Sequence, residues 1–281
     1  MKRILILPNP TRPNTMPLAQ RIADQLRVTG CQPLFCAELM GRFSRAEFLP
    51  LEQALEVCDL LLTVGGDGTI LHNVKYAVRY GKPILGVNSG RVGYLAQVEP
   101  NEIGFLSRLA SEEYGIERRM LLQIQVEGDP ETYLALNDVV VSKGGLSRLV
   151  DLEILGDGQP VGSYRADGLI FATPTGSTAY SLSAGGPIVD PGIDTILMTP
   201  ICPHSLYARS VLLSPQVELE VCGRYVNNLD RLVVSVDGDR VRTLECDRKV
   251  RIRRAEEAAQ FVQFAEKTFN GILNVKLKSW A

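Results

Sequence analysis

The spacing of apolar residues along the 281-residue chain follows two different patterns, and one pattern gives way to the other near Met120. Before it, short continuous apolar runs alternate with stretches in which apolar residues recur every three to four positions. Continuous runs are typical of strands buried on both faces, and the wider spacing is typical of amphipathic helices. This alternation predicts an α/β N-terminal domain with an open, mostly parallel, Rossmann-like sheet. Strands are expected at 2–7, 32–36, 60–64 and 83–87, and helices at 15–30, 51–58, 69–80 and 102–111.

After Met120 the apolar segments are short, alternating and rich in β-branched residues, and turn signals separate them. This pattern predicts a β-rich, mostly antiparallel C-terminal domain. We therefore expect an α/β domain at 1–118, a β-rich domain at 119–265, and a segment at 266–281 that packs back on the α/β domain. The expected strands of the second domain are 121–126, 133–141, 149–155, 168–172, 217–221, 232–236 and 250–253.

Composition excludes several classes of protein. The net charge of −2 gives no overall basic character, so we expect no nucleic-acid partner. No apolar run approaches the length of a membrane span, and the apolar run at the start is short and predicts a strand, not a signal peptide. Six scattered cysteines without a C-x-x-C pair indicate free thiols and a cytoplasmic location. Two histidines far apart in sequence do not support a zinc site.

A glycine-rich stretch lies where the strand 60–64 gives way to the helix 69–80. Gly65, Gly66 and Gly68 allow a ligand to approach the backbone closely, and Thr69 opens the helix. The N-terminus of a helix favours a negatively charged group, so these four residues predict a phosphate loop. The stretch is neither a G-x-x-x-x-G-K-[ST] loop nor a G-x-G-x-x-G loop.

Asp67 adds a negative charge where an anion is expected. The carboxylate could hold Mg²⁺ against phosphates, accept a proton from an attacking hydroxyl, or cap the helix. The residues 88–93 follow the next strand, so they should lie at the same edge of the sheet.

A second polar stretch follows the strand 168–172. Hydroxyl side chains are dense at 173–183 and stand among glycines, which suits a polar heterocycle or a sugar phosphate. The alternative is a solvated Ser/Thr loop.

Taken together, these motifs closely resemble those of bacterial NAD kinases. The resemblance runs over nearly the whole chain in the order typical of that family. GGDGT at 65–69 is shared with diacylglycerol and sphingosine kinases, whereas the block at 173–187 is specific. The further motifs are Leu136-Asn137-Asp138, the block 164–190, the stretch 199–206, and Ser235-Val236-Asp237-Gly238.

The resemblance implies roles for single residues. Asp67 would accept the proton of the adenosine ribose 2′-hydroxyl of NAD. Asn137 and Asp138 would bind ribose hydroxyls, as a paired amide and carboxylate can. Further nucleotide contacts are implied at Gly68, His72, Arg148, Arg165 and Asp167, and contacts with the adenine end at Thr178, Ala179, Tyr180, Ser181, Leu182 and Ser183.

The resemblance also implies a reaction and partners. NAD and ATP, or inorganic polyphosphate, would be the substrates, Mg²⁺ or another divalent metal the cofactor, and the assembly a homodimer or homotetramer. The alternatives are a diacylglycerol-type lipid kinase that shares GGDGT, and a dinucleotide-sensing module without turnover.

Overall fold

The computed structural model describes residues 1–90, 93–145, 149–224, 231–245 and 247–280. Its contacts divide the chain into two compact units: unit 1 contains Met1–Arg118 and Ala259–Ala281, and unit 2 contains Arg119–Ala258. The chain enters unit 2 along β6 (Gly115–Val126) and leaves it along β17 (Val250–Gln263). Residues 259–265, which the sequence analysis placed in the β-rich domain, are therefore grouped with the α/β unit.

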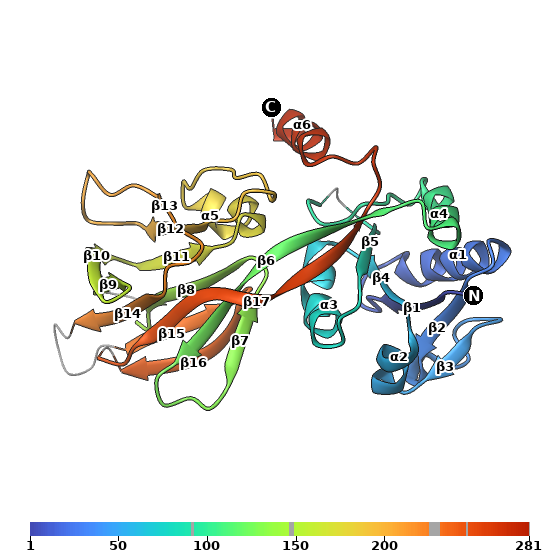
Figure 1. The fold of residues 1–281 in the computed structure, drawn as a ribbon, viewed down its shortest axis with the longest axis horizontal. Helices are drawn as coiled ribbons and strands as arrows, with labels where there is room; N and C mark the ends of the chain where they lie inside the picture. The colour runs from blue at the N-terminus through green and yellow to red at the C-terminus, as the bar shows by residue number, and fades with distance from the viewer. Residues whose placement is uncertain (91–92, 146–148, 225–230, 246, 281) are drawn as a thin grey trace. The chain divides into compact units, whose positions relative to one another are not determined.

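Unit 1 is built on a parallel sheet with the strand order β3-β2-β1-β4-β5 (Figure 1). The end of β17 adds to it in parallel, through the pair Phe261 and Ile84. The predicted parallel sheet is thus confirmed, although the three-residue β3 was too short to show a pattern. The strands are β1 (Arg3–Pro8), β2 (Gln32–Cys36), β3 (Glu47–Leu49), β4 (Leu60–Gly65) and β5 (Ile84–Asn88).

Helices α1, α2 and α3 pack against this sheet through the apolar positions that predicted them. In α1 the buried face contains Leu18, Ile22 and Leu26, and in α3 it contains Ile70 and Val74. The predicted helix at 102–111 is a 3₁₀ turn followed by one turn of α-helix. The helices are α1 (Thr15–Val28), η1 (Ala37–Leu39), α2 (Leu51–Val57), α3 (Asp67–Arg79), η2 (Ile103–Leu106), α4 (Ser107–Ser111) and α6 (Phe269–Trp280).

Unit 2 contains strands of two sheets. The first runs β10-β9-β14-β17, with β6 paired to β17 and β7, and the second runs β13-β12-β11-β8-β15-β16 with antiparallel pairs throughout. Buried side chains from both sheets form one core. The remaining elements are β7 (Thr132–Ala135), β8 (Asp138–Lys143), β9 (Val150–Gly156), β10 (Gln159–Ala166), β11 (Gly168–Ala172), η3 (Thr175–Thr178), α5 (Tyr180–Ser183), β12 (Ile196–Ile201), β13 (Val211–Leu213), β14 (Leu219–Arg224), β15 (Arg231–Val236) and β16 (Asp239–Glu245).

Strand β11 explains where the hydroxyl-rich stretch lies. Leu169 and Phe171 belong to the core between the sheets, while Ile170 and Ala172 pack on the other face with Val189. Because side chains alternate between the faces of a strand, a continuous apolar run is buried on both sides. The segment that follows β11 therefore covers the second face of this sheet.

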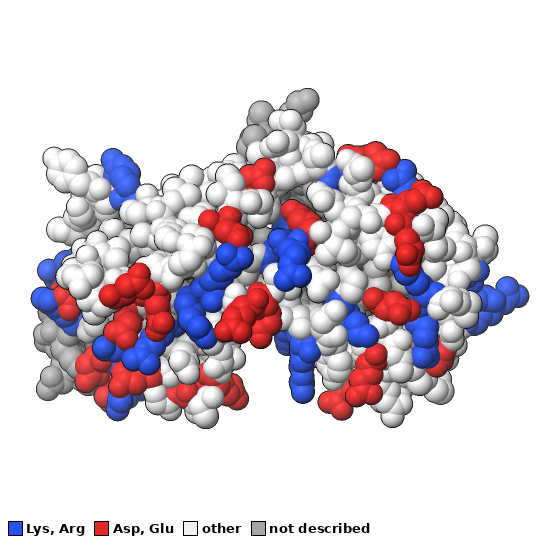
Figure 2. Space-filling model, in the orientation of Figure 1, with Lys and Arg blue, Asp and Glu red and all other residues white. Residues whose placement is uncertain are grey.

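Charged side chains are mixed rather than gathered by sign on the face drawn in Figure 2. Lysine and arginine alternate there with aspartate and glutamate over each unit. This mixed pattern agrees with the small net charge of the sequence.

Candidate functional site

The glycine-rich turn of unit 1 joins the carboxyl end of β4 to the first turn of α3. Gly65 is the last residue of β4, Gly66 is the N-cap, and Asp67 is the first residue of α3. A Cβ atom on Gly65 would overlap with the side chain of Thr69, so only glycine fits there. The predicted strand, turn and helix are confirmed.

The Asp67 side chain does not cap its helix. Instead, its carboxylate accepts hydrogen bonds from two backbone N–H groups beyond β5, Tyr94 at 2.7 Å and Leu95 at 3.2 Å. Gly93 packs so closely against the carboxylate that a Cβ atom on it would overlap with both carboxylate oxygens. The helix-cap alternative is therefore wrong, because the carboxylate is turned from its own helix toward the loop after β5.

The loops after β1, β4 and β5 meet at one edge of the sheet. Gly65 and Asn88 are register partners at the ends of β4 and β5. The amide Nδ2 of Asn9, just after β1, donates to Oγ1 of Thr69 at 3.0 Å. The Ser89 N–H donates to the Gly65 carbonyl at 3.0 Å. Three strand ends thus bring polar groups together around the turn, where ligands of open α/β sheets bind.

His72 is exposed on α3, and its ring lies edge-on to Tyr76 with centroids 6.2 Å apart. It stands one helical turn beyond Gly68, on the element that carries Asp67. The turn and α3 thus bring together the predicted residues of unit 1.

Unit 2 contains a pocket of about 570 Å3 at the start of β8. Asn137 and Asp138 line it, as do Asp167, Ala179 and Tyr180. Five residues predicted from separate parts of the sequence therefore share one cavity. The pocket is also lined by Val140, Ser142, Lys143, Ile201, Ser235, Asp237 and Gly238.

A half-buried carboxylate fixes the backbone at this pocket. Asp237 and Gly238 form the turn of the β15–β16 hairpin, both with positive φ, as an Asp-Gly turn of this kind requires. The Asp237 carboxylate accepts N–H bonds from Leu136 at 2.9 Å, Asn137 at 2.7 Å and Asp138 at 3.1 Å. Asp237 was expected only as part of a motif, and the Asp-Gly turn signal could have located it.

Two carboxyl groups thus interact at this pocket, that of Asp138 buried and that of Asp237 half-buried. Burial and the charge of Asp237 raise the pKa of Asp138 to about 7. Burial also raises the pKa of Asp237, although its three N–H bonds oppose that rise. A carboxyl group with such a pKa can donate or accept a hydrogen bond near neutral pH.

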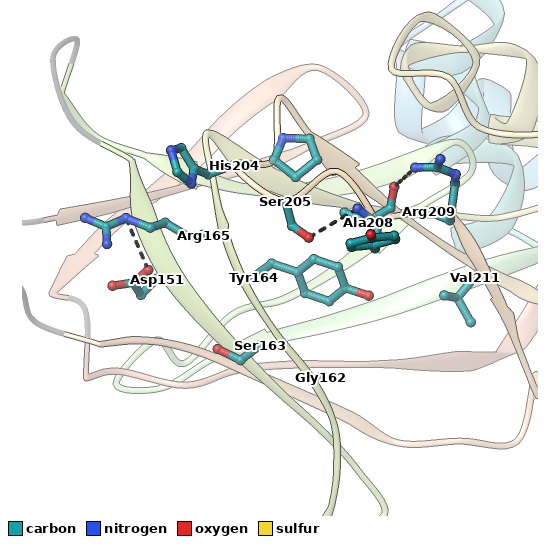
Figure 3. Close-up of a pocket in the computed structure, with 12 residues that line it drawn as sticks. Asp151, Gly162, Ser163, Tyr164, Arg165, His204, Ser205, Ala208, Arg209 and Val211 are labelled. Atoms are coloured by element: carbon teal, nitrogen blue, oxygen red, sulfur yellow. Dashed lines mark hydrogen bonds and ion pairs between the residues drawn. The ribbon is translucent and has the colours of Figure 1, made fainter.

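Asp167 and Arg165 lie two residues apart but line different pockets. Asp167 forms an ion pair with Lys143 in the pocket of Asn137. Arg165 lies 3.8 Å from Asp151 and lines a second pocket of about 560 Å3 with His204 (Figure 3). The structure therefore does not bring Arg165 into the first pocket. Arg148 lies outside the described residues.

Hydroxyl groups of the stretch 173–183 are used mainly inside the fold. Thr173 donates to the Leu136 carbonyl. Ser177 is buried against Val189, and its Oγ accepts the Val189 N–H at 3.0 Å. Ser181 is also buried, and its hydroxyl lies 2.9 Å from the Thr199 hydroxyl. The alternative of a solvated Ser/Thr loop is therefore wrong, but these three hydroxyls are already bonded within the protein.

Among the described residues, no three His, Cys, Asp or Glu side chains come together as a metal-binding group. No described helix combines the length and the apolar character that crossing a membrane requires. The five cysteines in the described part of the chain, Cys31, Cys36, Cys58, Cys202 and Cys222, are free thiols.

Unit 1 has the features of a phosphate-binding α/β fold, and unit 2 adds a polar pocket. Residues 4–114 match the family model of the ATP-NAD kinase N-terminal domain, and residues 136–264 match that of the ATP-NAD kinase C-terminal domain. The chain therefore belongs to the ATP-NAD kinase family.

Individual relatives agree. An NAD kinase of Heliobacterium modesticaldum is 37% identical over 285 residues, and one of Symbiobacterium thermophilum is 37% identical over 282 residues; each match covers 99% of both chains.

Solved structures show the same fold. Yeast NADH kinase complexed with NADH has a TM-score of 0.86 at 27% identity, and the match covers 98% of this chain and 86% of that one. An NAD kinase from Archaeoglobus fulgidus in complex with ATP has a TM-score of 0.75 at 27% identity, covering 98% and 99%.

Proposed function

We propose that this chain catalyses the reaction ATP + NAD⁺ → ADP + NADP⁺, with transfer of the terminal phosphoryl group to the 2′-hydroxyl of the adenosine ribose. Family membership over both units supports this proposal. The observation that carries it is the carboxylate of Asp67, which is fixed beside a glycine-rich turn at the N-terminus of α3. A lipid kinase that shares only GGDGT is not favoured, because the family match includes the C-terminal domain.

In this proposal Asp67 accepts the proton of the 2′-hydroxyl as the oxygen attacks the terminal phosphorus atom and the bond to the leaving phosphate breaks. General base catalysis of this kind typically contributes about 10²–10⁴-fold to the rate. The N–H bonds from Tyr94 and Leu95 hold the carboxylate in one orientation, so that little reorganisation is needed at the moment of transfer.

The pocket of unit 2 is proposed to bind NAD. Asn137 and Asp138 pair with ribose hydroxyls, since an amide and a carboxyl group offer both donors and acceptors. Asp237 acts through them, because it holds their backbone in place. Further NAD contacts are proposed at Gly68, His72, Arg148, Arg165, Asp167, Thr178, Ala179, Tyr180, Ser181, Leu182 and Ser183.

A divalent metal, Mg²⁺, is proposed as cofactor. The oxygen atoms around Asp67 fit a Mg²⁺ ion that arrives bound to the substrate. Mg²⁺ in such sites takes only a few ligands from the protein, and one carboxylate together with several amide and hydroxyl oxygens can supply them. Bound there, the metal would neutralise charge on the donor phosphates. Gly65, Gly66, Gly68 and Thr69 contribute the phosphate loop.

The remaining partners and the location are also proposals. A homodimer or homotetramer is supported by exposed apolar side chains in one loop of unit 2, Leu206 at 87% and Tyr207 at 90%. The free thiols support a reducing, cytoplasmic location. Light scattering of the purified protein tests the assembly.

The test of the proposed reaction is direct. Purified protein is incubated with NAD⁺ and Mg²⁺, together with ATP or polyphosphate, and NADP⁺ is measured. We expect NADP⁺ with ATP, and no turnover in excess EDTA. If NAD binds and no NADP⁺ forms with any donor, the protein is a dinucleotide sensor instead.

A further inference from the structure

The positively charged side chain of Arg12 lies beside the glycine-rich turn of unit 1 and has no role in the site described so far. Arg12 follows β1, and its guanidinium extends to the loops after β4 and β5. A Cβ atom on Gly66 would lie 3.1 Å from Arg12 Nη1, and one on Gly90 would lie 3.3 Å from the same atom. The absence of side chains at both glycines lets the guanidinium come this close to two backbones.

The loop that carries Arg12 is tied to the turn. The Asn9 amide donates to Thr69 at 3.0 Å, and Asn9 Oδ1 accepts bonds from the N–H of Thr11 at 3.0 Å and from its hydroxyl at 2.8 Å. Arg12 is the next residue. These bonds tie the backbone just before Arg12 to the first turn of α3, and the exposed Arg12 side chain extends from there.

The charge of Arg12 is unneutralised. Within the described ranges, no carboxylate lies within ion-pair distance of this guanidinium, whereas Arg3 pairs with Glu47 at 2.7 Å and Arg108 with Glu266 at 2.8 Å. The carboxylate of Asp67, the residue after Gly66, is bonded to backbone N–H groups. A planar guanidinium without a partner, held beside a glycine-rich turn, is suited to bidentate binding of a phosphate group.

We propose that Arg12 binds the terminal phosphates of the phosphoryl donor and neutralises them, the part that a lysine plays in G-x-x-x-x-G-K-[ST] loops. This inference rests on the proposed function and adds to it the residue that holds the donor. The carboxylate of Asp67 and the donor phosphates repel each other, and a guanidinium beside the glycine-rich turn lowers that repulsion.

The test compares three variants, Arg12→Ala, Arg12→Lys and Arg27→Ala. Arg27 is exposed in the last turn of α1, at the far end of the helix that follows the Arg12 loop, and is the matched control. Calorimetry measures the affinity for Mg²⁺-tripolyphosphate and for NAD separately, and steady-state kinetics gives KM for ATP and NAD. Thermal unfolding reports on the fold.

We expect Arg12→Ala to weaken tripolyphosphate binding and to raise KM for ATP roughly 10- to 100-fold, the effect of losing hydrogen bonds between charged groups. NAD affinity and Tm should not change. Arg12→Lys should recover part of the loss, because an ammonium keeps the charge without the bidentate geometry. Arg27→Ala should behave as wild type.

Two results would overturn the inference. One is wild-type tripolyphosphate affinity and KM for ATP in Arg12→Ala; the other is an equal loss for ATP and NAD together with a lower Tm, which would assign Arg12 to the fold. A wild-type protein that forms no NADP⁺ would instead refute the proposed function, and the tripolyphosphate titration would still decide whether Arg12 binds phosphate.

Discussion

At the scale of one residue, Asp67 has a structural role and a second role that we propose in catalysis. Its carboxylate joins the first turn of α3 to the segment after β5 through the N–H groups of Tyr94 and Leu95. In the proposed mechanism the same group accepts a proton. Substitution at this position therefore tests catalysis and local structure together.

We expect Asp67→Asn to lower the rate by roughly 10²–10⁴, because the amide cannot accept the proton. The amide oxygen can keep one N–H bond, but its NH₂ group faces the other N–H, so a fall in Tm of a few degrees is expected as well, from about 1 kcal/mol. Kinetics and thermal unfolding measure the two effects. Asp24→Asn, which changes an exposed carboxylate of α1, is the control. A variant with more than about a third of the wild-type rate would refute the catalytic role, and recovery of the rate at high Mg²⁺ would assign Asp67 to the metal.

Asp138 links stability to pH. Burial and the neighbouring Asp237 raise its pKa from 3.8 to about 7, so the folded protein favours the protonated form. This group contributes most to stability below about pH 4, and the contribution is lost as the pH rises to about 7.

Between pH 4 and pH 7 we expect the free energy of unfolding to fall in wild type and to fall less in Asp138→Asn. The two decreases should differ by on the order of 4 kcal/mol at most. Urea unfolding at several pH values measures this. Glu218→Gln, which changes an exposed carboxylate of the same unit, is the control. If the free energy of unfolding depends on pH in the same way in wild type and in Asp138→Asn, the group that takes up the proton is not Asp138.

At the scale of elements, two turns place the polar groups. The Asp237-Gly238 turn of a hairpin places the Asp237 carboxylate where it bonds to the backbone at the start of β8. The segment after β5 packs on the first turn of α3, where Tyr94 N–H bonds to Asp67. Gly93 matters in the second case, because only a residue without a side chain leaves room for the Asp67 carboxylate.

We expect Gly93→Ala to displace that carboxylate and to reduce kcat about 10²-fold, since a shift of about 1 Å in a reacting group has this effect. The control is Gly104→Ala, because a Cβ atom there meets nothing within 4 Å. If kcat and Tm of Gly93→Ala equal those of wild type, the backbone around residue 93 accommodates the methyl group without moving Asp67.

At the scale of the whole molecule, unit 1 is made from two separate pieces of chain. Val262 and Phe264 return from unit 2 and are fully buried in the core of unit 1, where Phe264 packs on Phe105 with ring centroids 5.3 Å apart. Lys267 then forms an ion pair with Glu102 at 2.6 Å. The core of unit 1 is therefore complete only when the chain has passed through unit 2.

A fragment of residues 1–118 should consequently fail to unfold cooperatively. It lacks two fully buried side chains worth about 1.5–3 kcal/mol each, a large part of a typical stability of about 5–15 kcal/mol. The same fragment joined by a linker to 259–281 should fold, and so should 119–258. Circular dichroism during heating distinguishes these cases. Cooperative unfolding of 1–118 alone, at a Tm near that of the linked fragment, would show that the C-terminal piece is dispensable.

Periodicity and local turn chemistry determined much of this protein from the sequence alone. The apolar runs of β1, β4 and β5 and the helical spacing of α1 and α3 depend on neighbours within one element, so the pattern showed them directly. Glycines between β4 and α3 predicted the turn there for the same reason. A resemblance carried by motifs then named the family, and the comparisons confirmed it.

Only the tertiary structure decided which polar side chains are bonded within the protein and which remain available to a ligand. Asp67 binds N–H groups 27 and 28 residues away, and Ser181 bonds to a hydroxyl 18 residues away, so no local spacing could show that the first is not a cap and the second is buried. Arg12 lies over a glycine turn 54 residues further along the chain because β1 and β4 are neighbours in the sheet. Such contacts arise from strand order, which brings distant loops together at one edge, and a linear pattern does not contain that order.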